Sequence, residues 1–133
     1  MAKYLLDSDV LIWVLRNRRD TIALVDRLVE EGGEAPACSA LSVLEIWAGT
    51  RASEETKTAA LLDALEAFPV TSEIARRAAE LLRARRRSHE PREWIDALIA
   101  STAMDRRLVL VTYNQRDYPY HDLVLYPIAA HSS

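Results

Sequence analysis

The chain has 133 residues, of which 50% are hydrophobic and 28% are charged, a composition typical of one folded globular domain that excludes a disordered chain. Its formal net charge of -3 excludes a broadly basic surface, so binding of nucleic acid would have to depend on a local patch or on a metal ion. The single cysteine, Cys38, excludes an internal disulfide framework and favours a cytoplasmic setting, and we expect neither a signal peptide nor a membrane span.

The first predicted element is a short buried strand, because the apolar run from Tyr4 to Leu6 stops abruptly at a carboxylate, a hydroxyl and a second carboxylate. The residues that follow predict a helix over 10–15, an amphipathic helix over 21–31 that ends at Gly32 and Gly33, a weak strand over 35–39, and a helix over 40–51. A helix over about 54–67 and a short strand over 68–70 come next.

The second half of the chain repeats this alternation. It predicts a helix capped by Thr71 or Ser72 and ending in the arginine-rich run 83–87, a helix from Pro91 to about Met104, a strand over 108–111, a loop over 112–117 and a last strand over 123–125. Strands that alternate with helices predict an α/β fold with a doubly wound parallel sheet and helices on both faces. We expect one domain over residues 1–133, with a disordered tail from about residue 129.

Acidic residues follow or flank the predicted strands at positions spread over most of the chain. Asp7 ends the first strand, Glu45 lies in the helix after the second, Asp96 lies in the second turn of the helix before the clearest strand, and Asp117 lies in the loop after it. In a doubly wound sheet these positions share one edge, at the carboxyl ends of the strands, where such folds bind ligands. We therefore expect the four acids to meet there, beside the oxygen atoms of Ser8, Asp9, Thr112 and Asn114.

An acidic cluster of this kind points to a metal ion, although a lone acid is more often a solvated residue or a helix cap. Closely packed carboxylates repel one another, and burial raises their pKa values unless a cation intervenes. Hard divalent ions such as Mg²⁺ and Mn²⁺ prefer oxygen ligands, and an ion so held activates water and neutralises charge on a phosphodiester. The residues therefore favour metal-dependent hydrolysis of a phosphate ester, with one or two ions among Asp7, Glu45, Asp96 and Asp117.

Four motifs surround these acids: Leu6-Asp7-Ser8-Asp9-Val10-Leu11, Ser42-Val43-Leu44-Glu45, Asp96-Ala97-Leu98-Ile99-Ala100 and Val111-Thr112-Tyr113-Asn114-Gln115-Arg116-Asp117-Tyr118. In this order and spacing, from Tyr4 to about Pro127, they resemble PIN-domain ribonucleases of the VapC toxin type. The resemblance implies a PIN-like domain and a Mg²⁺- or Mn²⁺-dependent endoribonuclease. Its acidic quartet is Asp7, Glu45, Asp96 and Asp117, and its hydroxyl positions are Ser8 and Thr112. It also implies a tRNA or ribosomal RNA substrate, a VapB-like antitoxin that inactivates the enzyme, and a homodimer or a toxin–antitoxin hetero-oligomer.

Several residues keep two interpretations at this point. Asp9 is either an outer contact of the metal site or a helix N-cap. Trp47 either packs inside the protein or touches an antitoxin. The candidate RNA-binding residues, which would contact the phosphate backbone unless they form only a solvated helix end, are Arg85, Arg86, Arg87 and Arg92.

Other functional classes are less well supported. Haloacid-dehalogenase-like phosphatases and response-regulator receiver domains also gather acids after a first strand, but both use a lysine late in the chain, and this chain has none after Lys57. A catalytically inert PIN-like module that only binds protein remains the alternative, and we would expect such a module to lack one of the four acids.

Overall fold

The structure, a computed structural model, describes residues 2–85 and 90–128, so the expected tail from residue 129 and the predicted Arg86 and Arg87 lie outside the described residues. At its centre is a four-stranded parallel sheet in the spatial order β3-β2-β1-β4. The strands are β1 (Tyr4–Leu6), β2 (Ala37–Ser39), β3 (Glu66–Phe68) and β4 (Val109–Val111). The direction of winding reverses between β1 and β4, which confirms the doubly wound α/β fold.

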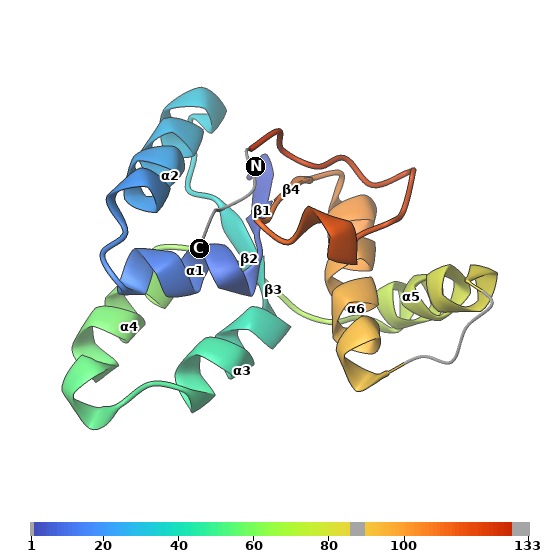
Figure 1. The fold of residues 1–133 in the computed structure, drawn as a ribbon, viewed down its shortest axis with the longest axis horizontal. Helices are drawn as coiled ribbons and strands as arrows, with labels where there is room; N and C mark the ends of the chain where they lie inside the picture. The colour runs from blue at the N-terminus through green and yellow to red at the C-terminus, as the bar shows by residue number, and fades with distance from the viewer. Residues whose placement is uncertain (1, 86–89, 129–133) are drawn as a thin grey trace.

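Helices cover both faces of this sheet. They are α1 (Ser8–Leu15), α2 (Arg19–Gly32), α3 (Ala40–Ala48), α4 (Glu55–Asp63), α5 (Ser72–Ala84) and α6 (Pro91–Arg106), with short 3₁₀ turns at Ala52–Glu54 and Gln115–Asp117. Helices α1, α2 and α4 lie on one face, and α5 and α6 lie on the other (Figure 1). Within the described ranges, none of these helices combines the length and the apolar character needed to cross a membrane.

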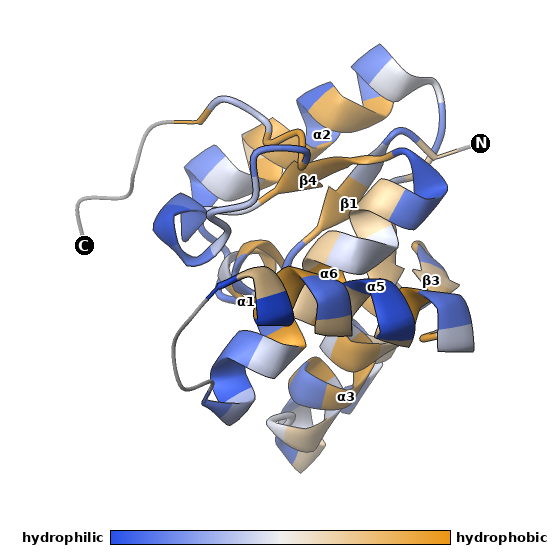
Figure 2. Cartoon of the chain, turned by 90° about the vertical axis from the view of Figure 1, so that its right-hand side faces the viewer, coloured by the Kyte–Doolittle hydropathy of each residue, from blue (hydrophilic) through white to orange (hydrophobic). Residues whose placement is uncertain are grey.

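Alternate residues of each strand face the two layers of helices. Leu5 packs in a cluster with Ile99 of α6, whereas Leu6 packs with Val10 of α1 and Leu24 of α2. This period of two is the ordinary geometry of a strand, and Figure 2 shows β1 and β4 in the colours of hydrophobic residues. Because β1 and β4 are covered on both faces, their sequences are apolar runs, and they hold the residues that follow them at a rigid edge.

Local signals in the sequence set the helix ends. Gly33 adopts a φ of 69° and closes α2 with a left-handed cap, as the glycine pair predicts. Thr71, and not Ser72, caps α5, because its Oγ1 accepts a hydrogen bond from the N–H of Ile74 at 3.1 Å. Pro91 stands at the start of α6, where its missing N–H breaks no helical hydrogen bond.

Four predicted elements differ from the structure, each for a local reason. The helix predicted over 54–67 ends at Asp63, and β3 lies before Pro69 instead of including it, since proline has no N–H for strand pairing. The helix predicted over 40–51 ends ahead of Gly49, because glycine is a poor helix former. The strand predicted over 123–125 is one isolated bridge from Leu125 to β4, and the next carbonyl along, that of Tyr126, accepts instead from the Gln115 side chain at 2.8 Å.

Candidate active site

Asp7 lies where the chain passes from β1 into α1, and its relative exposure is only 8%. It is the N-cap residue of α1, and its Oδ1 accepts a hydrogen bond from the N–H of Ser8 at 2.8 Å. Its Oδ2 accepts two hydroxyl hydrogen bonds, from Thr112 at 2.9 Å and from Tyr118 at 2.8 Å. Burial raises the pKa of Asp7 above its ordinary value, and these hydrogen bonds oppose the rise because they stabilise the charged form.

Asp9 joins the start of α1 to the loop that follows β4. Its Oδ2 accepts a hydrogen bond from the N–H of Tyr113 at 2.9 Å, next to the buried Thr112. The N-cap interpretation of Asp9 is wrong, because Asp7 occupies that position. Burial, and then the nearby charge of Asp7, raise the pKa of Asp9 to about 6. In the same loop, the N–H of Asn114 donates to Oγ1 of Thr112 at 3.1 Å, so Asp9 and Thr112 together fix the end of β4.

Helix α3 supplies Glu45 to the same edge of the sheet. The Ser8 hydroxyl lies 3.2 Å from Oε1 of Glu45 and 2.9 Å from Oγ of the buried Ser42, so it links α1 to α3. Glu45 itself is exposed, and its neighbour Leu44 is 65% exposed. The apolar neighbours of Glu45 in the sequence therefore do not indicate burial.

Asp96 and Asp117 complete the set of predicted acids from the last two elements. Asp96 lies in α6, and Asp117 ends the 3₁₀ turn after β4. The Tyr118 hydroxyl lies 3.5 Å from Oδ1 of Asp96, and a guanidinium nitrogen of Arg92 lies 4.0 Å from Oδ2 of Asp117. Burial, and then the charges of Asp7 and Asp117, raise the pKa of Asp96 to about 6, while Arg92 opposes the rise.

A cavity of about 400 Å³ gathers these residues at the carboxyl edge of the sheet, where the direction of winding reverses. Its lining includes five carboxylates, those of Asp7, Asp9, Glu45, Asp96 and Asp117, together with Ser8 and Asn114. Arg92 is the single basic residue in the described part of the lining. Thr112 lies outside the lining and reaches the site through its hydrogen bond to Asp7. The structure thus places the whole predicted quartet around one cavity whose negative charge is largely unbalanced.

The donors of this cavity fit a hard divalent cation in their chemistry, since they are oxygen atoms and most carry negative charge. As the side chains stand, residues 2–85 and 90–128 contain no group of three or more acidic, histidine or cysteine side chains that could hold a metal ion. Hydroxyl and N–H groups engage the oxygens of Asp7 instead. Ligation therefore requires the more exposed carboxylates to turn toward a common point.

Two of the arginines predicted to bind RNA, Arg85 and Arg92, adjoin the acids on one side. Arg92 lines the acidic cavity, and Arg85 lines a smaller hollow of about 230 Å³ that shares part of its lining with the cavity. The Arg85 guanidinium lies 6.0 Å from the centroid of the Tyr120 ring. Arg116, from the loop after β4, lines the same hollow. The positive charge here is therefore assembled from three elements and is not a property of the arginine run alone.

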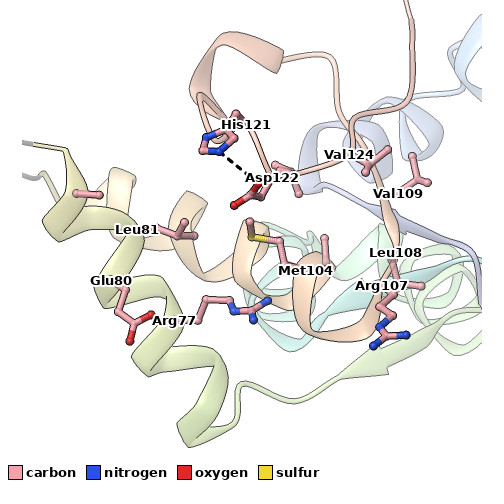
Figure 3. A pocket seen from close by; sticks show the side chains of 13 residues that line it. Arg77, Glu80, Leu81, Met104, Arg107, Leu108, Val109, His121, Asp122 and Val124 are labelled. Carbon is pink, nitrogen blue, oxygen red and sulfur yellow. Dashed lines mark ion pairs between the residues drawn. The ribbon is translucent and has the colours of Figure 1, made fainter.

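A larger hollow, of about 710 Å³, lies at the opposite edge of the sheet, beside the amino end of β4. Leu81 and Met104 face it from α5 and α6, and above them His121 and Asp122 are paired at 3.3 Å (Figure 3). Its described lining mixes apolar side chains with charges of both signs, and it contains no cluster of carboxylates. Size alone therefore does not identify the active site of this protein.

Two residues of the site received no role from the sequence, Ser42 and Tyr118. Ser42 precedes Glu45 by three positions, a spacing that puts both on one side of a helix and could have revealed it. Tyr118 offers no comparable signal, because its buried position depends on the turn that follows β4 and not on a periodic pattern.

The sequence is similar to families and proteins that are already known. The model of the PIN domain family matches residues 4–120. Ribonuclease VapC10 of Mycobacterium tuberculosis is 38% identical over 126 residues, which cover 94% of this chain and 92% of that protein. Ribonuclease VapC19 of the same organism is 35% identical over 115 residues, which cover 86% of this chain and 91% of that protein.

Solved structures share the fold. A toxin–antitoxin complex from Klebsiella pneumoniae contains a chain with a TM-score of 0.74 and 25% identity, and the match covers 95% of this chain and all of that one. VapBC2 from Rickettsia felis, bound to a DNA fragment from its promoter, matches with a TM-score of 0.76 over 92% of this chain and 96% of that one. That second match, at 21% identity, bears on the fold alone. The strand order, the acidic edge and the matches along nearly the whole chain lead to one conclusion, that the protein belongs to the PIN-domain family.

Proposed function

We propose that this protein is a Mg²⁺- or Mn²⁺-dependent endoribonuclease that acts as the toxin of a toxin–antitoxin pair. The charge imbalance of the acidic cavity carries the proposal, with five carboxylates against one arginine in the described lining. Carboxylates that are partly buried together are unfavourable unless a cation neutralises them. The similarity over most of the chain to two proteins named ribonuclease VapC supports RNA as the substrate.

The proposed catalytic and metal-holding residues are Asp7, Glu45, Asp96 and Asp117, and the proposed supporting residues are Ser8, Asp9, Thr112 and Asn114. A divalent ion at such a site supplies activation of water and neutralisation of charge on the scissile phosphate. Thr112 orients Asp7, and Ser8 orients Glu45, through the hydrogen bonds described above. Asp9 holds the loop after β4 against α1. These contacts fix the buried Asp7 and the loop after β4 before the substrate arrives, so that only the more exposed acids have to turn toward the ion.

We propose that the RNA backbone approaches from the side of Arg92, Arg85 and Arg116. The protein carries a net charge of -3 and repels RNA at long range, so its positive groups must act locally, beside the acids. We propose tRNA or ribosomal RNA as the substrate, because the motifs around the four acids resemble those of VapC-type ribonucleases.

We propose that a VapB-like antitoxin silences the enzyme by neutralising the same acids. An arginine placed among these carboxylates would form charge-assisted hydrogen bonds with them. Leu44 and Trp47 of α3 are 65% and 46% exposed, and they offer apolar surface on the helix that carries Glu45, for an antitoxin or a second copy of the chain. The toxin–antitoxin complex from Klebsiella pneumoniae supports such a partner.

The buried free thiol of Cys38 agrees with a cytoplasmic setting.

An RNA cleavage assay tests the proposal. Purified protein, freed from any antitoxin, is incubated with a mixed pool of tRNA and ribosomal RNA in the presence of Mg²⁺ or of EDTA. We expect discrete cuts that need the metal, disappear with Asp96→Asn, and persist with Asp122→Asn, the same change of chemistry at an exposed site. If the protein neither cut RNA nor bound Mn²⁺, the proposal would be contradicted and an inert PIN-like binding module would be favoured.

A further inference from the structure

Tyr118 is a buried tyrosine whose hydroxyl points into the acidic site. Its relative exposure is 3%, and its ring packs in the hydrophobic cluster that contains Leu5 and Ile99. Its backbone N–H donates to the carbonyl of Gln115 at 3.0 Å, which anchors it to the 3₁₀ turn after β4. The ring and the backbone are therefore both held, and the hydroxyl has little freedom to leave the site.

The hydroxyl of Tyr118 contacts one acid closely and lies near a second. It donates to Oδ2 of Asp7 at 2.8 Å, while its oxygen lies 3.5 Å from Oδ1 of Asp96. A hydroxyl has one proton to donate, and the shorter distance assigns that proton to Asp7. A hydrogen bond from a neutral hydroxyl to a buried carboxylate is charge-assisted and stronger than one between neutral groups.

A count of the lone pairs of Asp7 shows what this bond does. Each carboxylate oxygen can accept about two hydrogen bonds. The two acceptor positions of Oδ2 are filled by the hydroxyls of Tyr118 and Thr112, whereas Oδ1 accepts only the N–H of Ser8 among the described residues. One acceptor position of Asp7 is therefore left, and it belongs to Oδ1.

We propose that Tyr118 is a positioning residue of the active site: together with Thr112 it holds Oδ2 of Asp7 and leaves Oδ1 as the oxygen that meets a divalent ion. This inference rests on the proposed function, because it presupposes a metal ion at the acidic cavity. Residues that orient a metal ligand typically contribute 10- to 100-fold to metal affinity or activity. Tyr118 does not touch the ion in this account and acts only through Asp7.

Tyr118→Phe tests the inference, because phenylalanine keeps the buried ring and removes only the hydroxyl. We expect Mn²⁺ affinity, measured by isothermal titration calorimetry, to fall about 10- to 100-fold. We also expect the Mg²⁺ concentration that gives the half-maximal cleavage rate to rise, while the rate at saturating Mg²⁺ stays near that of the wild type. A merely structural role would not separate these two kinetic quantities.

Tyr4→Phe is the matched control, since Tyr4 also donates a hydroxyl hydrogen bond to a carboxylate, that of Glu31 at 3.1 Å, on an exposed surface away from the site. Its Mn²⁺ affinity is expected to equal that of the wild type. If Tyr118→Phe bound Mn²⁺ as tightly as the wild type, the inference would fail and the proposed function would stand, even if the melting temperature fell. If the wild type itself bound no Mn²⁺, the proposed function would fail and the inference with it.

Discussion

The two edges of the sheet present hollows of contrasting character. The larger hollow, about 710 Å³ at the amino end of β4, sets Arg77 and Arg107 against Glu80 and Asp122, so its charges are balanced. The smaller cavity, about 400 Å³ at the carboxyl end, holds five carboxylates and one arginine in its described lining. An unbalanced charge costs free energy, and a fold that keeps it at a topological switch point indicates a ligand that neutralises it. The functional edge is therefore identified by its unbalanced charge and by its place at the carboxyl ends of the strands, and not by the volume of its cavity.

The largest expected effect is the loss of activity when one acid of the cavity is neutralised. Asp7→Asn keeps the size of the side chain and removes the charge, so RNA cleavage is expected to fall by orders of magnitude as metal binding is lost. The initial rate on a labelled RNA, with Mg²⁺ in excess, measures the effect. Glu80→Gln, the same kind of change in the larger hollow, is expected to leave the rate unchanged. Equal losses from both substitutions would break the contrast between the edges.

A second expected effect concerns pH and stability in the absence of metal. The pKa of Asp9 and that of Asp96 are raised to about 6, so between about pH 4 and pH 6 the folded protein keeps protons that the unfolded chain has released. Their contribution to the free energy of unfolding is therefore lost as pH rises through this range. The free energy of unfolding of Asp96→Asn, relative to that of the wild type, should therefore increase from pH 5 to pH 7.5. Urea unfolding in EDTA at the two pH values measures this difference.

Asp122→Asn serves as the control for that measurement, because Asp122 is exposed at the balanced edge. Its stability relative to the wild type should change little between the two pH values. A stability difference between Asp96→Asn and the wild type that stayed constant with pH would contradict the raised pKa of Asp96.

A third effect, on substrate binding, is expected from Arg92→Ala. Loss of one phosphate contact should weaken RNA binding and reduce the slope of log affinity against log salt concentration by about 0.7 to 1. Fluorescence anisotropy with a labelled RNA in Ca²⁺ or EDTA, across a series of salt concentrations, measures both quantities. Arg77→Ala, in the larger hollow, is expected to change neither the RNA affinity nor its salt dependence. An equal reduction of the slope with Arg77→Ala would indicate that the RNA binds the opposite edge of the sheet, which would contradict the prediction.

The smallest effect on activity is expected in the floor of the larger hollow. Met104→Ala removes a partly buried side chain and should cost about 1–2 kcal/mol of stability, below the range for fully buried methionine. Cleavage at a temperature well below the melting point should stay at the wild-type rate. A large loss of activity in a stably folded Met104→Ala protein would show that the two edges are coupled.

The sequence predicts the fold and the gathering of the acids because both depend on short-range patterns. Apolar runs that end at Asp7 and near Thr112 mark two neighbouring strands, and parallel pairing then brings their ends together without further information. The same reasoning places Glu45 and Asp96 one to two turns into their helices, near the edge where the strands end. These predictions need only strand direction and helix direction.

The features that the sequence does not reveal depend on tertiary contacts. Glu45 is exposed although its neighbours are apolar, because the helix that carries it leaves one apolar face uncovered in the isolated chain. The role of Tyr118 depends on a turn that sends its ring under Asp7. β3 ends before Pro69, and the apolar residues on either side of this proline favoured a strand that includes it. For Glu45 and Tyr118 the outcome is decided by residues far away in the sequence, whereas the end of β3 is set by the adjacent Pro69.

The most direct test of the central claim is to locate a metal ion in the protein. Crystals grown or soaked with Mn²⁺ would give an anomalous difference map in which the ion appears as a peak. We expect that peak in the acidic cavity, about 2 Å from oxygens of the quartet, with Oδ1 of Asp7 among its ligands. A fully soaked crystal with no peak in that cavity, or with its strongest peak in the larger hollow beside Glu80 and Asp122, would contradict it.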